Sequence, residues 1–85
     1  MSEIELKHVY SDSHIISFQI IKSGEIIGEV QIYPAYKEIK ISVGRSEAMA
    51  EDGVIREDMS YIDDRDRDII DYVVKELTRR FFKKS

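Results

Sequence analysis

The chain has 85 residues, a net charge of −4 and no cysteine. Domains smaller than about 50 residues are uncommon, so we expect residues 1–85 to form a single domain. The lack of cysteine excludes disulfide scaffolds, thiol catalysis and cysteine zinc sites. No apolar run approaches the roughly 18 residues of a membrane-spanning helix, so we expect no membrane segment. The N-terminus lacks the basic and apolar regions of a signal peptide, and we expect a cytoplasmic protein.

The charges are distributed unevenly along the chain. Residues 45–72 hold four basic and ten acidic side chains, a net −6, whereas residues 73–85 hold five basic and one acidic, a net +4. Binding of nucleic-acid phosphates needs an extended positive stripe, which this chain lacks apart from its short basic end.

Alternating apolar residues in the first half of the chain predict four antiparallel strands joined as a meander. One face of this sheet is apolar, and the other face is mostly polar, as expected for an antiparallel sheet covered on one side. The strands are expected at residues 3–10, 14–21, 25–33 and 38–43.

The turn lengths set the expected strand register. At residues 22–24 we expect a three-residue loop that pairs Phe18 with Gly28. A two-residue loop would place Phe18 opposite Glu29 and mix core with charge. The other expected pairs are Ile20 with Ile26, Ile16 with Val30, Ile32 with Ile39, Val30 with Ile41, Leu6 with Phe18, and Ile4 with Ile20.

The apolar face of the sheet must be shielded from water, and the pattern of residues 64–83 predicts a helix that covers it. Their apolar side chains recur at helical spacing, and either Asp63 or Asp64 can cap the helix N-terminus. The apolar positions are Ile69, Ile70, Val73, Val74, Leu77, Phe81 and Phe82.

The segment between the sheet and this helix is the least regular part. Residues 46–52 favour a short helix that ends at Gly53. Whether residues 53–62 add a strand stays open. The fold class is therefore α+β: a four-stranded antiparallel meander, one long C-terminal helix packed on one face, and a short helix at 46–52.

No catalytic, metal or cofactor site is expected. Residues 63–68 are acidic, but the glycine and glutamate that a calcium loop needs are missing from its sixth and twelfth positions. Residues 11–14 contain serine, aspartate and histidine, yet adjacent turn residues do not form a catalytic triad. His8 and His14 fall on neighbouring strands without facing each other, and we expect packed, hydrogen-bonded side chains rather than metal ligands.

Five apolar residues interrupt the polar face of the predicted sheet. Several are β-branched and lie on neighbouring strands, so this outer apolar set is a candidate for dimerisation or for docking of another protein. Scattered surface apolar residues are also common in monomers, and that alternative stays open. The first or fourth strand is also expected to be an exposed edge, open to strand addition. The outer apolar set is Val9, Ile15, Ile21, Ile27 and Tyr33.

Two charged surfaces are further candidates. The acidic segment 45–72 offers a surface for a basic partner, at Glu51, Asp52, Glu57 and Asp58. The end of the predicted helix mixes cations with phenylalanines, the composition of single-stranded nucleic-acid and anionic-surface binders. Its cations are Arg79, Arg80, Lys83 and Lys84.

These observations together favour a small, acidic, cytoplasmic protein-binding module that acts as an adaptor, inhibitor or modulator of a larger protein. We expect a homodimer without catalysis or cofactor. The alternative is a single-stranded nucleic-acid or anionic-surface binder that uses the basic end of the helix.

Overall fold

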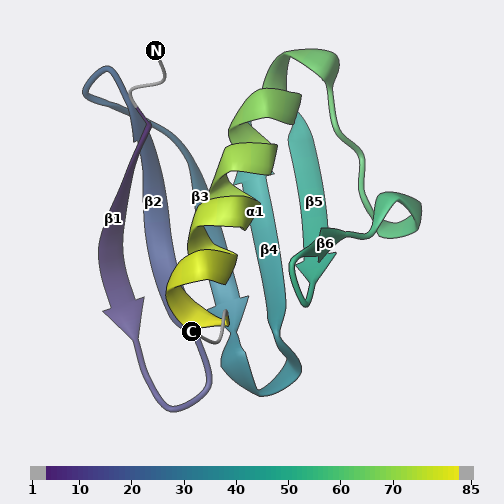
Figure 1. The fold of residues 1–85 in the computed structure, drawn as a ribbon. Helices are drawn as coiled ribbons and strands as arrows, with labels where there is room; N and C mark the ends of the chain where they lie inside the picture. Colours follow the sequence, from purple (N-terminus) through teal and green to yellow (C-terminus); the bar gives the residue numbers. More distant parts are fainter. Residues whose placement is uncertain (1–3, 83–85) are drawn as a thin grey trace.

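The structure is a computed structural model and describes residues 4–82. A six-stranded antiparallel sheet carries one long helix across one face (Figure 1), and each strand pairs with the next strand in sequence. The expected α+β class, the antiparallel sheet and the C-terminal helix are confirmed, but the sheet has six strands rather than four. The elements are β1 (Ile4–Ser11), β2 (Ile16–Lys22), β3 (Glu25–Tyr33), β4 (Glu38–Val43), β5 (Ser46–Glu51), β6 (Val54–Ile55) and α1 (Arg67–Phe81), with short 3-10 helices at Pro34–Tyr36, Glu57–Met59 and Asp64–Asp66.

The short helix expected at 46–52 is wrong, because residues 46–51 form β5. Gly44 has a φ of 58°, which allows a two-residue turn that returns the chain alongside β4. The side chains of β5 that point toward α1 are small, and all are buried. They are Ser46, Ala48 and Ala50, with exposed fractions of 2%, 5% and 1%. Small residues here let the helix and the sheet approach closely. Because β5 pairs with β4, β4 is not a sheet edge.

The residues that follow β5 form a further hairpin. Asp52 and Gly53 have φ angles of 53° and 87°, as in a two-residue turn with two left-handed residues. Gly53 is therefore part of a hairpin turn and not the end of a helix. β6 then pairs with β5 over two residues, and Tyr61 forms a separate bridge to Glu47.

The β2–β3 hairpin has a different register from the expected one. Its turn contains two residues, Ser23 and Gly24, both with positive φ. A shift in the ladder next to Ile20 leaves Ile27 as an extra residue on β3. This bulge restores the alternation that a plain two-residue turn would invert. The observed pairs are Phe18 with Val30, Ile16 with Ile32, Ile20 with Gly28, and Ile21 with Ile26, so the expected partners of Phe18, Ile16 and Ile20 are wrong.

The β1–β2 hairpin is shifted for the same physical reason. Val9 is an extra residue on β1, between the pairs formed by His8 and Tyr10. The expected pairs of this hairpin are therefore also wrong. The observed pairs are Leu6 with Ile20, Ile4 with Lys22, and His8 with Phe18. By contrast, the β3–β4 hairpin has no bulge, and its expected pairs of Ile32 with Ile39 and Val30 with Ile41 are confirmed.

The core lies between α1 and the central strands. The buried face of α1 consists of Ile70, Val73, Val74 and Leu77, which pack against apolar residues of β2 to β5. The Asp63 carboxylate accepts a hydrogen bond from the Arg65 N–H at 2.9 Å and so caps the 3-10 helix Asp64–Asp66. α1 itself begins at Arg67, and its N-cap residue is Asp66, whose side chain makes no capping hydrogen bond, so the expected capping of the long helix by Asp63 or Asp64 is wrong. Within residues 4–82, no helix is long and apolar enough to cross a membrane.

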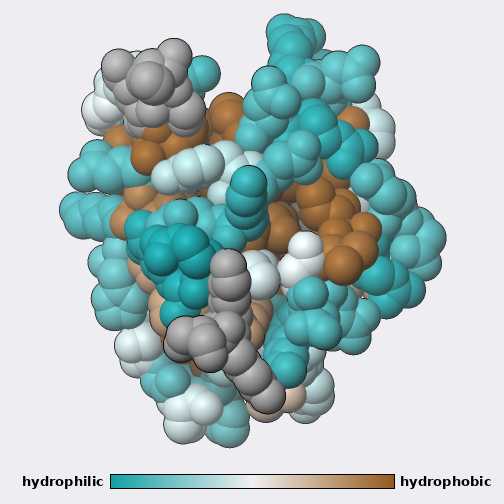
Figure 2. All heavy atoms as spheres, viewed as in Figure 1, coloured by the Kyte–Doolittle hydropathy of each residue, from teal (hydrophilic) through white to brown (hydrophobic). Residues whose placement is uncertain are grey.

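One helix does not cover a sheet of this width. A helix with its side chains is about 10–12 Å across, whereas neighbouring strands are about 4.8 Å apart, so α1 shields two or three strands. Figure 2 shows apolar surface on both sides of the helix, over β1 and β2 on one side and toward β6 on the other. α1 therefore leaves apolar surface exposed on both of its flanks.

Candidate protein-binding groove

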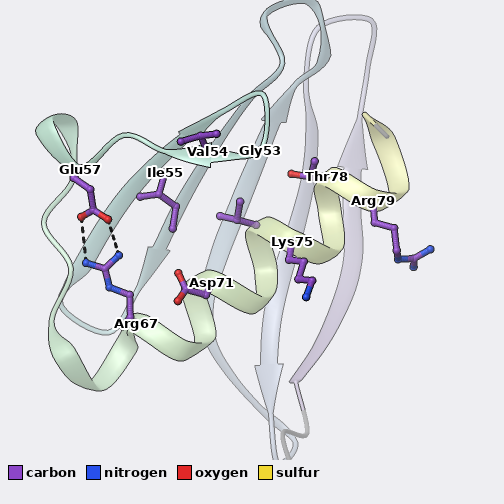
Figure 3. A pocket seen from close by; sticks show the side chains of 10 residues that line it. Gly53, Val54, Ile55, Glu57, Arg67, Asp71, Lys75, Thr78 and Arg79 are labelled. Atoms are coloured by element: carbon purple, nitrogen blue, oxygen red, sulfur yellow. Dashed lines mark hydrogen bonds and ion pairs between the residues drawn. The ribbon is translucent and has the colours of Figure 1, made fainter. Parts of the chain in front are cut away.

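A groove of about 750 Å³ lies between α1 and the β5–β6 hairpin. Ile55 and the β5–β6 turn form one wall, and Val74 and Thr78 of α1 form the other (Figure 3). The Val54 side chain is 66% exposed and lies on the opposite face of the hairpin, which it shares with its ladder partner Glu51. The apolar side chains that the groove offers to a ligand are therefore those of Ile55 and Val74.

The two ends of the groove are closed by contacts between its walls. At one end the turn lies directly against the helix, since a Cβ atom on Gly53 would be 3.1 Å from Thr78 Cγ2. At the other end the Arg67 guanidinium donates two hydrogen bonds to the Glu57 carboxylate, at 2.8 and 3.1 Å. The hydrogen bonds from Arg67 lower the pKa of Glu57, and they raise the pKa of Arg67. This bidentate pair fixes the segment after β6 to the beginning of α1.

The rim of the groove on α1 carries both signs of charge. Asp71 and Lys75 are exposed on the helix, one turn apart. Within residues 4–82, Lys75 forms no ion pair with another residue. It is therefore free to meet an acidic group on a bound molecule.

The Thr78 hydroxyl is the polar group in the wall of the groove. Its oxygen is buried, and among the described residues it has no hydrogen-bond partner. Leaving a buried hydroxyl without a partner is energetically unfavourable.

The outer apolar set does not form one surface. Ile21 pairs with Ile26 at one end of the β2–β3 ladder, and Tyr33 lies seven residues further along β3, about 23 Å away. Ile27, the extra residue of the bulge, packs against the core, and Val9 is 47% exposed at the bulge of β1. Tyr33 instead stacks beneath Lys40 Nζ, which is 5.4 Å from the ring centre. The two bulges separate residues that plain alternation would place together.

The acidic set is largely paired within the molecule. Arg56 binds both Glu51 at 2.9 Å and Asp58 at 3.1 Å, and its hydrogen bonds lower the pKa of Asp58. Glu57 is held by Arg67, as described above. Asp52 belongs to the β5–β6 turn, where its N–H donates to the Lys37 carbonyl at 2.9 Å. These acids therefore present less free charge than the sequence suggests.

The basic end of α1 is also partly neutralised. Arg79 and Arg80 both contact Glu76 Oε2 at 2.7 Å. Their hydrogen bonds lower the pKa of Glu76 to about 2. Lys83 and Lys84 lie outside the described residues.

The two histidines lie in different environments. His8 is exposed on β1, with its ring centre 5.5 Å from the Phe18 ring centre in an edge-to-face arrangement. His14 lies in the β1–β2 loop, where its backbone N–H donates to Asp12 Oδ1 at 2.7 Å. Asp12 also accepts a bond from the Ile15 N–H, so the serine, aspartate and histidine of this segment form a turn. Within residues 4–82, no three histidine, cysteine or acidic residues cluster as metal ligands would.

Comparison with protein-family models, with curated proteins and with solved structures finds no match for this chain. Any function of the groove must therefore be inferred from its geometry alone. Sequence reasoning missed it because the groove depends on the β5–β6 hairpin, where a short helix was expected instead. One available signal was the Asp52-Gly53 dipeptide, a strong indicator of a two-residue hairpin.

Proposed function

We propose that this chain is a small cytoplasmic protein-binding module that acts as an adaptor, inhibitor or modulator of a larger protein. It holds a short segment of that protein in the groove between α1 and the β5–β6 hairpin. The observation that carries the proposal is the groove itself, which has the apolar side chains of Ile55 and Val74 in its walls and is closed at both ends. Sites of this kind typically combine apolar walls with a few polar groups that fix orientation.

The groove length indicates the size of the bound segment. Between its end contacts at Arg67 and Thr78 the groove follows α1 for eleven residues, about 16 Å. An extended chain advances about 3.3 Å per residue, so about five residues fit. The walls favour apolar side chains, and Lys75 favours an acidic residue beside them. The expected ligand is therefore a short extended segment that is mainly apolar and carries one acid.

Selection of peptides from a random phage-displayed library tests this proposal. Bound peptides are expected to shift the amide resonances of residues 53–55 and of the facing side of α1. The variant Ile55→Asp should weaken binding about tenfold or more, because it places a charge in the apolar wall.

The matched control is Val54→Asp. Val54 is the neighbouring residue on β6, but its side chain is 66% exposed on the opposite face of the hairpin, beside Glu51. Equal loss of affinity in the two variants, or a library that yields no groove-binding peptide, would contradict the proposed site.

The alternative function, single-stranded nucleic-acid binding at the end of α1, has its own test. Because Glu76 holds both Arg79 and Arg80, Glu76→Gln should release them. If the alternative holds, this variant binds immobilised single-stranded DNA more tightly than the wild type, and the binding weakens steeply with salt. No retention of either protein at low salt removes the alternative.

A further inference from the structure

The two edges of the sheet differ in whether their outward backbone groups have hydrogen-bond partners. Beyond β5, the Glu47 and Tyr61 backbones exchange two hydrogen bonds at 2.9 and 2.8 Å. The Met49 N–H donates to Ser60 Oγ at 3.0 Å, and its carbonyl accepts from the Arg56 N–H at 2.8 Å. The outward backbone groups of Glu47 and Met49 on β5 therefore have hydrogen-bond partners within the chain. β1, at the opposite edge, pairs with β2 on one side over eight residues and has no strand on its other side among the described residues (Figure 1).

The ladder shows which groups of β1 face outward. Lys22 and Glu25 close a two-residue turn, so the backbone of Lys22 bonds to β3. Backbone direction alternates along a strand, and Ile21 and Gln19 therefore bond to β1. Their partners are Glu5 and Lys7. It follows that the N–H and C=O groups of Ile4, Leu6 and His8 point away from the sheet.

The side chains of this edge are complementary to a second copy of the same edge. An antiparallel pairing centred on Leu6 places Leu6 opposite itself and Ile4 opposite His8 of the second copy. The same register places Glu5 opposite Lys7 of the second copy, twice by symmetry. These charged residues face Ile21 and Gln19 on β2, and neither forms an ion pair within residues 4–82. Opposite charges directly across an antiparallel pair are favourable, whereas like charges are unfavourable.

The backbone agrees with this register. The outward groups of Ile4, Leu6 and His8 are the ones that meet their counterparts, and a two-fold axis through a hydrogen-bonded pair is compatible with antiparallel strands. Ile4 and Leu6 are half-buried and already pack against the core, so the pairing extends the apolar helix-facing layer. The bulge at Val9 ends the regular ladder after His8.

We propose that two copies of this chain pair through residues 4–8 of β1 to form one continuous antiparallel sheet of twelve strands. The groove at the opposite edge is left open in both copies. This inference is independent of the proposed function, and each can fail without the other.

Sedimentation velocity over a concentration series from about 10 μM to about 1 mM tests the pairing. The wild type is expected to dimerise reversibly. Glu5→Lys and Lys7→Glu each place like charges opposite one another at two symmetric positions, and each should raise the dimer dissociation constant about tenfold or more. A mixture of the two variants should dimerise at least as tightly as the wild type, because one chain is then uniformly basic and the other uniformly acidic at this edge.

The control variant is Glu29→Lys, a charge reversal at an exposed position of the central strand β3, which should leave the dimer unchanged. Circular dichroism of each variant checks that the fold is retained. The proposal is overturned if the wild type is monomeric throughout the series. It is equally overturned if both charge reversals dimerise like the wild type, or if their mixture associates no more tightly than each variant alone.

Discussion

Ser46 links the sheet to the beginning of α1, and replacing it with alanine should destabilise the protein markedly. Its side chain is 2% exposed. The hydroxyl donates to Asp66 Oδ2 at 2.7 Å and accepts from the Asp63 N–H at 2.8 Å. The same Asp66 carboxylate lies against Gly44, where a Cβ atom would be 2.9 Å from either oxygen. One hydroxyl therefore connects the β4–β5 turn region with the segment that leads into the helix.

The expected loss follows from these two bonds. A hydrogen bond to a charged group contributes about 1.5–3 kcal/mol, and a neutral one contributes about 1 kcal/mol. Alanine at position 46 also leaves the Asp63 N–H without its partner, while the methyl group remains buried. We expect Ser46→Ala to lower the free energy of unfolding by about 2–3 kcal/mol. For a domain of this size, such a loss lowers Tm by about 10 °C or more.

Urea unfolding followed by circular dichroism measures this loss. The control is Ser42→Ala, because Ser42 is a strand serine on the exposed face of β4. Its replacement should change the free energy of unfolding by less than about 0.5 kcal/mol. Equal stability of the two variants would refute the reasoning, since it would show that the Ser46 hydrogen bonds add nothing to the docking of α1.

Two further predictions concern a strand glycine and an acid-dependent ion pair. Gly28→Ala should cost several kcal/mol in thermal unfolding, because the new Cβ would lie 2.3 Å from the Ser42 carbonyl oxygen, whereas Gly24→Ala, in open space at a φ of 81°, should cost about 1 kcal/mol. Equal losses would contradict the close backbone approach. The pKa of Glu76 is lowered from 4.5 to about 2, so its ion pairs stabilise the fold above pH 4.5, and that stabilisation is lost as the pH falls toward 2. In urea titrations the stability difference between the wild type and Glu76→Gln should therefore shrink across this pH range, and a constant difference would contradict the assignment.

Both proposed contact surfaces have the same origin in the fold. α1 lies over the middle of the six-stranded sheet and leaves the two flanks of the sheet uncovered. On the β6 side the chain forms a groove that it does not fill. On the β1 side, among the described residues, it leaves a strand edge without a partner strand and two charges, Glu5 and Lys7, without an ion pair. The molecule therefore has two separate places at which binding can add buried area and hydrogen bonds.

The sequence by itself determined the features that depend on local chemistry. The β3–β4 register follows from Pro34, a four-residue loop and alternating apolar residues, with no extra residue in either strand. The position of α1 follows from its helical periodicity, and Asp63 caps the 3-10 turn that leads into it by accepting a hydrogen bond from the Arg65 N–H. In both cases the residues that make the interaction are close in sequence, so the pattern contains the necessary information.

The tertiary structure alone decided the rest. Residues 46–51 contain good helix formers. They nevertheless form a strand, because pairing with β4 buries their small side chains beneath α1. The bulges at Val9 and Ile27 each insert one residue, and alternation cannot reveal an insertion that the opposite strand defines. The groove likewise joins Ile55 to Val74, which are distant in sequence. Each feature depends on which segments pack together, a relation between parts of the chain that a local pattern does not contain.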